Sequence, residues 1–195
     1  MKRLSIFVSG GGTNLQRIAE YFAENPEVEI ANVICNNPNA YAIERAKNLG
    51  IPCKIINRAE FKSEDFSKEL LDQNIDLIVL AGFLWLVPQH LIEAFPNKII
   101  NIHHSFLPAF VGAKPYHAAF ERGVKLIGAT SHYVTSDLDA GPIIEQDITR
   151  ISHKDTIDNL IGKGRDLEKI VLSRAVAKHI ERKILVYKNK TIVFN

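Results

Sequence analysis

An asparagine and two histidines stand where an apolar run ends, in the segment IINIHHSFLP at residues 99–108. Asn101 and His103 are two residues apart, so in an extended strand their side chains share one face, while His104 lies on the other. An amide donor beside an imidazole can stabilise a developing oxyanion, and the imidazole can also transfer a proton. The spacing indicates a catalytic pair, Asn101 and His103. A hydrogen-bonded histidine at a strand end is the alternative, and His104 alone is expected to be structural.

A glycine-rich loop, SGGGTN at residues 9–14, follows the first apolar run. Glycines let the backbone turn tightly and approach a ligand closely, and the unpaired N–H groups that begin a helix favour an anion. Gly11, Gly12, Thr13 and Asn14 are therefore candidates for binding a phosphate or a carboxylate. The loop matches neither the dinucleotide fingerprint nor a Walker loop. The alternative is a plain strand-to-helix turn, with Thr13 or Asn14 as the helix cap.

A turn-rich acidic loop, SDLDAGP at residues 136–142, follows a strand-like segment that contains His132. A carboxylate there, such as Asp139, could keep a neighbouring imidazole protonated or relay a proton through water. Turn chemistry alone is the alternative, because Asp, Gly and Pro are common turn residues. A site formed by His132, His103 and Asp139 matches no zinc or EF-hand spacing, so we expect no metal.

The elements that must position these loops alternate along the chain, which predicts an α/β fold with a mostly parallel sheet. Strands are expected at residues 3–8, 29–35, 53–57, 76–83, 98–103, 127–134 and 143–151, the last two antiparallel, with a hairpin at 184–187 and 191–194. Helices are expected from Leu15 to Phe22 and at 40–49, 61–73, 88–95 and 115–122, with one or two helices in 155–183. Open α/β sheets bind ligands beyond the carboxyl ends of their strands, where the three loops would gather. No nucleophile motif is present, so this set suits acyl transfer without a covalent intermediate.

The chain has 195 residues, enough for one domain with a sizeable core, so we expect a single domain over residues 1–195. No apolar run approaches a membrane span and no secretory leader precedes the first strand, so we expect a cytoplasmic protein without a membrane partner. The net charge is +2, and the basic segment 150–195 lacks the aromatic interleaving of a nucleic-acid surface. We expect small-molecule substrates, no nucleic acid, and a monomer or homodimer.

The motif N-x-H-x-S-x-L-P at residues 101–108, together with DAGPI at 139–143, resembles the folate-dependent formyltransferase family over essentially the whole chain. The resemblance implies the formyltransferase-type, Rossmann-like α/β fold, with helices on both faces of the sheet. It also implies 10-formyltetrahydrofolate as co-substrate, with Asn101, His103 and Asp139 as the catalytic trio. Asn101 and His103 would hold the formyl oxygen as the carbon becomes tetrahedral. Asp139 would keep His103 charged and help to move protons.

The two halves of the chain resemble different branches of that family. Residues 1–98 resemble phosphoribosylglycinamide formyltransferase through the glycine-rich loop, which in that branch holds the substrate phosphate, and through AGFLWLV at 81–87, which lines its folate pocket. Residues 99–195 resemble formyltetrahydrofolate deformylase, which hydrolyses the same folate, through HHSFLPAF, GAKPYH and GRDLEK. Transferases usually carry proline where His104 stands. Deformylases usually begin with a regulatory ACT domain, which is not expected in this chain, and lack the glycine-rich loop.

An anion-binding loop has no evident use in hydrolysis of a folate, so we expect transfer of the formyl group to the amine of glycinamide ribonucleotide, in purine synthesis. The resemblance implies substrate-binding residues Gly11, Gly12, Thr13, Asn14 and Glu168, and cofactor-binding residues Phe83, Leu84, Trp85, Leu86, Val134 and Thr135. For Glu168 the alternative is a helix-surface charge. Hydrolysis by a deformylase, transfer to another amine such as an amino-sugar nucleotide, and a non-catalytic folate- or nucleotide-binding protein are the other functions considered.

Overall fold

The computed structural model describes residues 1–194, which fall into two compact units, Met1–Asn101 and the residues from Ile102 onward. The strands are β1 Lys2–Val8, β2 Val28–Cys35, β3 Cys53–Ile55, β4 Leu77–Leu80, β5 Ile99–His103, β6 Leu126–Tyr133, β7 Ile143–Arg150, β8 Ile184–Tyr187 and β9 Lys190–Val193. The helices are α1 Thr13–Phe22, α2 Tyr41–Asn48, α3 Arg58–Lys62, α4 Glu64–Asp72, α5 Gln89–Ala94, α6 Pro115–Arg122 and α7 Ile157–Ile180. The predicted α/β class with a mostly parallel sheet is confirmed.

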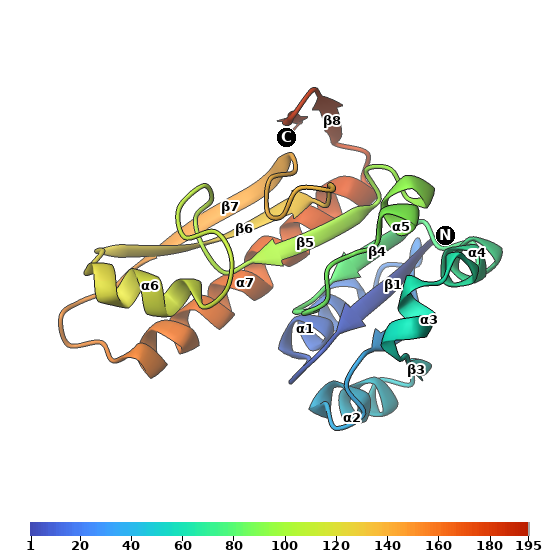
Figure 1. The fold of residues 1–195 in the computed structure, drawn as a ribbon, viewed down its shortest axis with the longest axis horizontal. Coiled ribbons are helices and arrows are strands. Elements are labelled where there is room, and N and C mark those ends of the chain that lie inside the picture. The colour runs from blue at the N-terminus through green and yellow to red at the C-terminus, as the bar shows by residue number, and fades with distance from the viewer. Residues whose placement is uncertain (195) are drawn as a thin grey trace. The chain divides into compact units, whose positions relative to one another are not determined.

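The first unit is a parallel sheet in the strand order β3-β2-β1-β4-β5, with α1 to α5 between the strands (Figure 1). All four residues of β4 are buried, as expected for a central strand covered on both faces. Crossover helices between parallel strands put the carboxyl ends of β1, β4 and β5 at one edge of this sheet. The glycine-rich loop and the 81–87 segment begin at two of those ends.

The second unit is built around the antiparallel pair β6 and β7, with α7 packed against both strands. α6 and α7 contribute to a small core in which Tyr116, Ala119 and Leu160 are buried. Thr156 and Asn159 form a capping box that fixes the start of α7. β8 and β9 form a separate hairpin. The expectation of one catalytic domain over residues 1–195 stays a prediction.

Two element boundaries were predicted wrongly. The single helix expected at 61–73 is two helices, because Ser63 has an extended backbone (φ −77°, ψ 138°) and accepts a hydrogen bond from the N–H of Asp65 to begin α4. The strand expected at 76–83 ends at Leu80, before Gly82 adopts a φ of 81°. The segment 155–183, left open as one or two helices, contains the single helix α7.

Candidate active site

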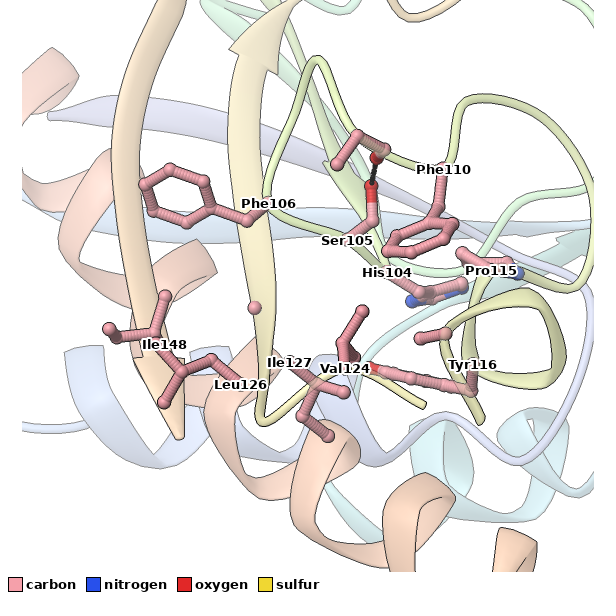
Figure 2. Close-up of a pocket in the computed structure, with 13 residues that line it drawn as sticks. His104, Ser105, Phe106, Phe110, Pro115, Tyr116, Val124, Leu126, Ile127 and Ile148 are labelled. Carbon is pink, nitrogen blue, oxygen red and sulfur yellow. Dashed lines mark hydrogen bonds between the residues drawn. The ribbon is translucent and has the colours of Figure 1, made fainter. Parts of the chain in front are cut away.

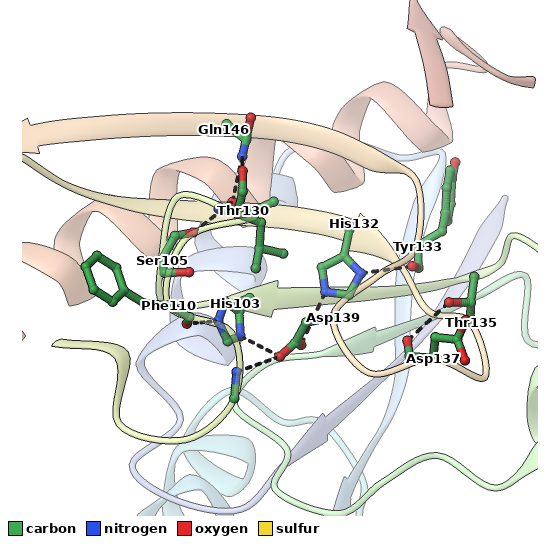
Figure 3. A network of polar contacts seen from close by, with 12 residues as sticks. His103, Ser105, Phe110, Thr130, His132, Tyr133, Thr135, Asp137, Asp139 and Gln146 are labelled. Atoms are coloured by element: carbon green, nitrogen blue, oxygen red, sulfur yellow. Dashed lines mark hydrogen bonds and ion pairs between the residues drawn. The ribbon is translucent and has the colours of Figure 1, made fainter. Parts of the chain in front are cut away.

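His103 is the last residue of β5, and its imidazole lies between two acceptors (Figure 3). Its Nδ1 is 3.2 Å from Oδ2 of Asp139, and its Nε2 is 3.0 Å from the backbone oxygen of Phe110. Both contacts are satisfied only when both ring nitrogens carry a proton, since neither acceptor can donate. The surroundings therefore favour the imidazolium, a form that can donate a hydrogen bond or a proton.

The pKa values of this pair follow from the same geometry. Burial lowers the pKa of His103, but hydrogen bonds to Asp139 and Phe110 and the nearby carboxylate charge raise it above its ordinary 6.5. Burial raises the pKa of Asp139, but hydrogen bonds from His103 and His132 hold it well below its ordinary 3.8. The side chains are only 7% and 6% exposed, so solvent screens this ion pair weakly.

The pair predicts how stability depends on pH. The contribution of His103 is fully present below the unfolded-state pKa of 6.5 and is lost as pH rises through the higher folded-state value. The contribution of Asp139 is present above 3.8 and is lost as pH falls through its lower folded-state value. We expect the free energy of unfolding to decline above pH 6.5 more steeply in the wild type than in His103→Gln. Urea unfolding across that pH range measures the difference, and equal slopes would contradict the ion pair.

The loop after β6 presents Asp139 to the imidazole. Asp139 has a φ of 52°, a left-handed conformation that aspartate tolerates better than most residues. A Cβ at Gly141 would lie 1.8 Å from the backbone oxygen of Tyr133, and the N–H of Tyr133 donates to the oxygen of Pro142 at 2.9 Å. Only glycine therefore lets this loop fold back onto the end of β6.

The fit at Gly141 makes a stability prediction. Gly141→Ala places a methyl group inside the backbone of Tyr133, so we expect the free energy of unfolding to fall by at least about 3 kcal/mol. Gly162 is the matched control, because it lies in α7 and a Cβ there meets no atom within 4 Å. Gly162→Ala is expected to stabilise the protein by about 0.5–1 kcal/mol. Urea denaturation of both variants measures the two changes, and similar stabilities would refute the close approach.

His132 is a third group at the carboxylate, and no catalytic role was predicted for it. Its Nδ1 donates to the backbone oxygen of Tyr133 at 2.9 Å, which leaves Nε2 facing Oδ1 of Asp139 at 3.8 Å (Figure 3). The N–H of Gly112 approaches Oδ2 of Asp139 at 3.4 Å. His103 and Gly112 thus approach one carboxylate oxygen and His132 the other, which fixes the orientation of Asp139.

Asn101 lies in β5 two residues before His103, so strand alternation puts both side chains on one face. Its Cα is paired with that of Leu80 in β4, and the residue is half-buried. This agrees with the expected placement of an amide and an imidazole at one strand end. The catalytic role of Asn101 stays a prediction.

Glu168 is not a helix-surface charge. It lies in α7, only 4% exposed, and accepts a hydrogen bond from the hydroxyl of Tyr116 at 2.5 Å. Nδ1 of His104 is 3.0 Å from the same carboxylate oxygen, Oε1. Sequence periodicity placed Glu168 on a helix but did not reveal these partners. The available signal was Gly164, a glycine inside a helix, which often marks a close approach.

The glycine-rich loop begins α1 in the first unit. Gly12 is the N-cap with a φ of 73°, so the alternative of Thr13 or Asn14 as the cap is wrong. A Cβ at Gly12 would lie 2.8 Å from that of Ala42 in α2, and Arg45 donates to the oxygen of Gly11 at 2.8 Å. Gly12 is therefore required by the fold, whether or not the loop also binds an anion.

The 83–86 segment contacts the same loop. The N–H of Leu84 donates to the Ser9 hydroxyl at 2.8 Å. Leu84 and Leu86 are 81% and 74% exposed, a surface suited to an apolar ligand. Phe83 and Trp85 instead pack into an aromatic cluster with Phe61, at centroid separations of 5.2 and 5.6 Å. Of these four predicted cofactor residues, Leu84 and Leu86 are the ones that present most surface.

The structure thus gathers the predicted residues into one group in each unit. The first group holds the glycine-rich loop and the 83–86 segment. The second holds His103, Asp139 and Glu168. Val134 and Thr135, both half-buried, begin the loop that carries Asp139. Four further residues contact this second group and were not predicted as site members: His104, Phe110, Tyr116 and His132.

A cavity of about 320 Å³ lies within the second unit beside this group (Figure 2). Its walls are almost entirely apolar, with Phe106, Phe110 and Ile148 among them. His104 and Tyr116 supply ionisable side chains at its border. The cavity is large enough for water or a small part of a substrate to approach His104.

No cluster of three or more His, Cys, Asp or Glu side chains in residues 1–194 is arranged to hold a metal ion. Among the helices of the same residues, none combines the length and apolarity needed to cross a bilayer.

Comparison of the sequence and structure with known proteins shows which family the chain belongs to. The model of the formyl transferase family matches residues 2–176. The chain belongs to this family. A formyltetrahydrofolate deformylase of Bacillus subtilis (strain 168) is 50% identical over 100% of the chain and 66% of its own length. The chain spans 54–66% of the length of the curated deformylases it matches.

Solved structures of two kinds of formyl transferase family member superpose on the whole chain. Glycinamide ribonucleotide transformylase 1 from Symbiobacterium toebii has a TM-score of 0.94 and 33% identity over 100% of this chain and 95% of its own. A formyltetrahydrofolate deformylase from Pseudomonas syringae pv. tomato has a TM-score of 0.93 and 41% identity, over 100% of this chain and 66% of its own. The shared fold confirms the expected formyltransferase-type architecture, with helices on both faces of the sheet. Fold alone does not separate the two activities.

Proposed function

We propose that this chain hydrolyses 10-formyltetrahydrofolate to formate and tetrahydrofolate. The observation that carries formyl chemistry is the His103 imidazole, held charged by Asp139 at the end of β5, two residues after Asn101. Water is favoured over an amine as nucleophile because the deformylase of Bacillus subtilis is 50% identical over the whole chain, against 33% for the transformylase of Symbiobacterium toebii. Hydrolysis replaces formyl transfer to glycinamide ribonucleotide, which was the activity predicted from the sequence.

The reaction follows from the donors at this strand end. Water adds to the formyl carbon, and the carbonyl electron pair moves onto oxygen. The amide of Asn101 and the imidazolium of His103 donate hydrogen bonds to that oxyanion. In the structure Nε2 of His103 donates to the backbone oxygen of Phe110, so the formyl oxygen takes the place of that carbonyl. Collapse breaks the carbon–nitrogen bond, and the folate nitrogen takes a proton as it leaves.

Asp139 supports both stages of the reaction. Its negative charge keeps His103 protonated while charge develops on the formyl oxygen. His132 and Gly112 hold the carboxylate from other directions, so Asp139 keeps its orientation as the imidazole gives and regains a proton.

Transfer to glycinamide ribonucleotide is the second candidate, because the loop at residues 9–14 begins α1 with backbone N–H groups that suit a phosphate. The requirement for Gly12 in packing weakens this argument, since the glycine has a purpose without a ligand.

Turnover with and without the amine separates the two candidates. Purified protein is mixed with 10-formyltetrahydrofolate, and tetrahydrofolate and formate are followed in the absence and presence of glycinamide ribonucleotide. We expect equal rates in both, with one formate for each tetrahydrofolate. Turnover only with the ribonucleotide, with a formylated amine as product, would establish the transferase. No turnover in either mixture would contradict both.

A further inference from the structure

A second carboxylate–imidazole pair lies next to the first. His104 lies just beyond the end of β5, so strand alternation does not place its side chain, and the expected position on the opposite face is wrong. The rings of His103 and His104 lie side by side, with centroids 6.4 Å apart and planes inclined by only 20°. His103 faces Asp139, and His104 faces Glu168 at 3.0 Å. In the proposed reaction His103 donates a hydrogen bond to the oxyanion. A second group must accept the proton of the attacking water, because a protonated imidazole cannot.

The position of Glu168 is built by its neighbours. Its carboxylate accepts from the hydroxyl of Tyr116, which is buried in the core between α6 and α7. A Cβ at Gly164 would lie 2.1 Å from that hydroxyl oxygen, so the glycine in α7 makes room for the tyrosine. A buried carboxylate is costly and glycine weakens a helix interior, so stability alone does not explain this arrangement.

The ring of His104 has one buried and one exposed side. Nδ1 is buried, without a hydrogen bond of good angle, but within ion-pair distance of Glu168. The side chain is nevertheless 35% exposed, so the exposed part of the ring lies away from Nδ1 and borders the cavity with Tyr116 (Figure 2). An imidazole oriented through one nitrogen by a carboxylate, with its other nitrogen open, is the arrangement of a general base.

We propose that His104 is the general base that takes a proton from the attacking water, with Glu168 and Tyr116 as the residues that position its ring. This rests on the hydrolytic function proposed above. Nε2 of His104 accepts the proton as the water oxygen bonds to the formyl carbon and the carbonyl electrons move onto oxygen. When the carbon–nitrogen bond breaks, the folate nitrogen takes a proton from His103. Collapse releases formic acid, which ionises to formate. His104 releases its proton to solvent and His103 takes one back, so the site regains its starting ionisation and the net products are formate, tetrahydrofolate and one proton.

The test compares two nucleophiles in His104→Ala. Hydroxylamine attacks a formyl carbon before it loses a proton, so it needs a base less than water does. We expect kcat for hydrolysis to fall by about 10²–10⁴-fold with KM unchanged. Deformylation by hydroxylamine should fall by less than about threefold. His104→Gln, which keeps side-chain bulk but cannot act as a base, should behave like His104→Ala and guards against a folding defect. His153→Ala, at an exposed histidine, is the matched control and should keep wild-type rates.

The positioning roles of Tyr116 and Glu168 are tested separately, by comparing the changes in kcat and KM. Tyr116→Phe and Glu168→Gln should lower kcat by about 3- to 30-fold without raising KM, because they loosen the base and leave the oxyanion donors in place. Equal losses with water and hydroxylamine in His104→Ala, or hydrolysis near the wild-type rate, would overturn the role of His104 while the hydrolytic function stands. Absence of hydrolysis by the wild type would overturn both.

Discussion

Asp139→Asn is expected to lower kcat for 10-formyltetrahydrofolate by about 10³–10⁴-fold. The amide keeps the shape of the carboxylate but removes the negative charge 3.2 Å from Nδ1 of His103. Without that charge, burial dominates and disfavours the imidazolium. His103 then loses its proton near neutral pH and stabilises the oxyanion poorly. Steady-state kinetics at pH 7 and at a lower pH measure the effect, and acid should restore part of the rate.

The matched control for Asp139→Asn lies in the same loop. Asp137 is exposed, and its backbone oxygen accepts hydrogen bonds from the hydroxyl of Thr135 and the N–H of Ala140. Asp137→Asn should therefore keep wild-type kinetics. An Asp139→Asn variant that retained a tenth of wild-type turnover would contradict the role assigned to the carboxylate.

Asn101→Ala is expected to lower kcat by about 10²–10³-fold, because one hydrogen-bond donor to the oxyanion is removed. The side chain is half-buried at the end of β5, so the strand should form without it. Asn101→Asp keeps the size but replaces a donor with a charged acceptor, so its loss should be at least as large. Steady-state kinetics measure kcat of both variants, and thermal unfolding checks that each variant is folded.

Asn39→Ala, at an exposed asparagine in a loop, is the control for the Asn101 variants and should be unaffected. Near-wild-type activity of Asn101→Ala, with the fold intact, would remove the amide from the mechanism.

The sequence predicted the parts of the site that depend on local pattern. Asn101 and His103 are two residues apart in β5, so they share one face of the strand. Asp139 lies in the acidic loop that follows the next strand. The contact between His103 and Asp139 depends on Gly141 approaching the backbone of Tyr133, a tertiary fit that no local pattern encodes. Phe110 likewise could not be foreseen, because its backbone oxygen rather than its side chain meets the imidazole.

The helix break at Ser63, the burial of Glu168 and the contact made by His104 all depend on interactions that sequence spacing does not encode. Helical periodicity in 61–73 continues across Ser63, but capping by that side chain ends one helix and starts another. Glu168 has helical spacing and a charge, which favours the surface. Its burial depends on Tyr116 reaching across to α7 at a position where Gly164 leaves room. His104 was expected to be structural, but its contact with Glu168 gives it a candidate role in acid–base chemistry.

The measurement that tests the central claim most directly is hydrolysis in H₂¹⁸O, with the isotope content of formate followed by mass spectrometry. The account predicts one ¹⁸O atom in each formate released, at a rate that falls in Asp139→Asn and is unchanged by glycinamide ribonucleotide. Formyl groups that appear on the ribonucleotide instead of in labelled formate would contradict it.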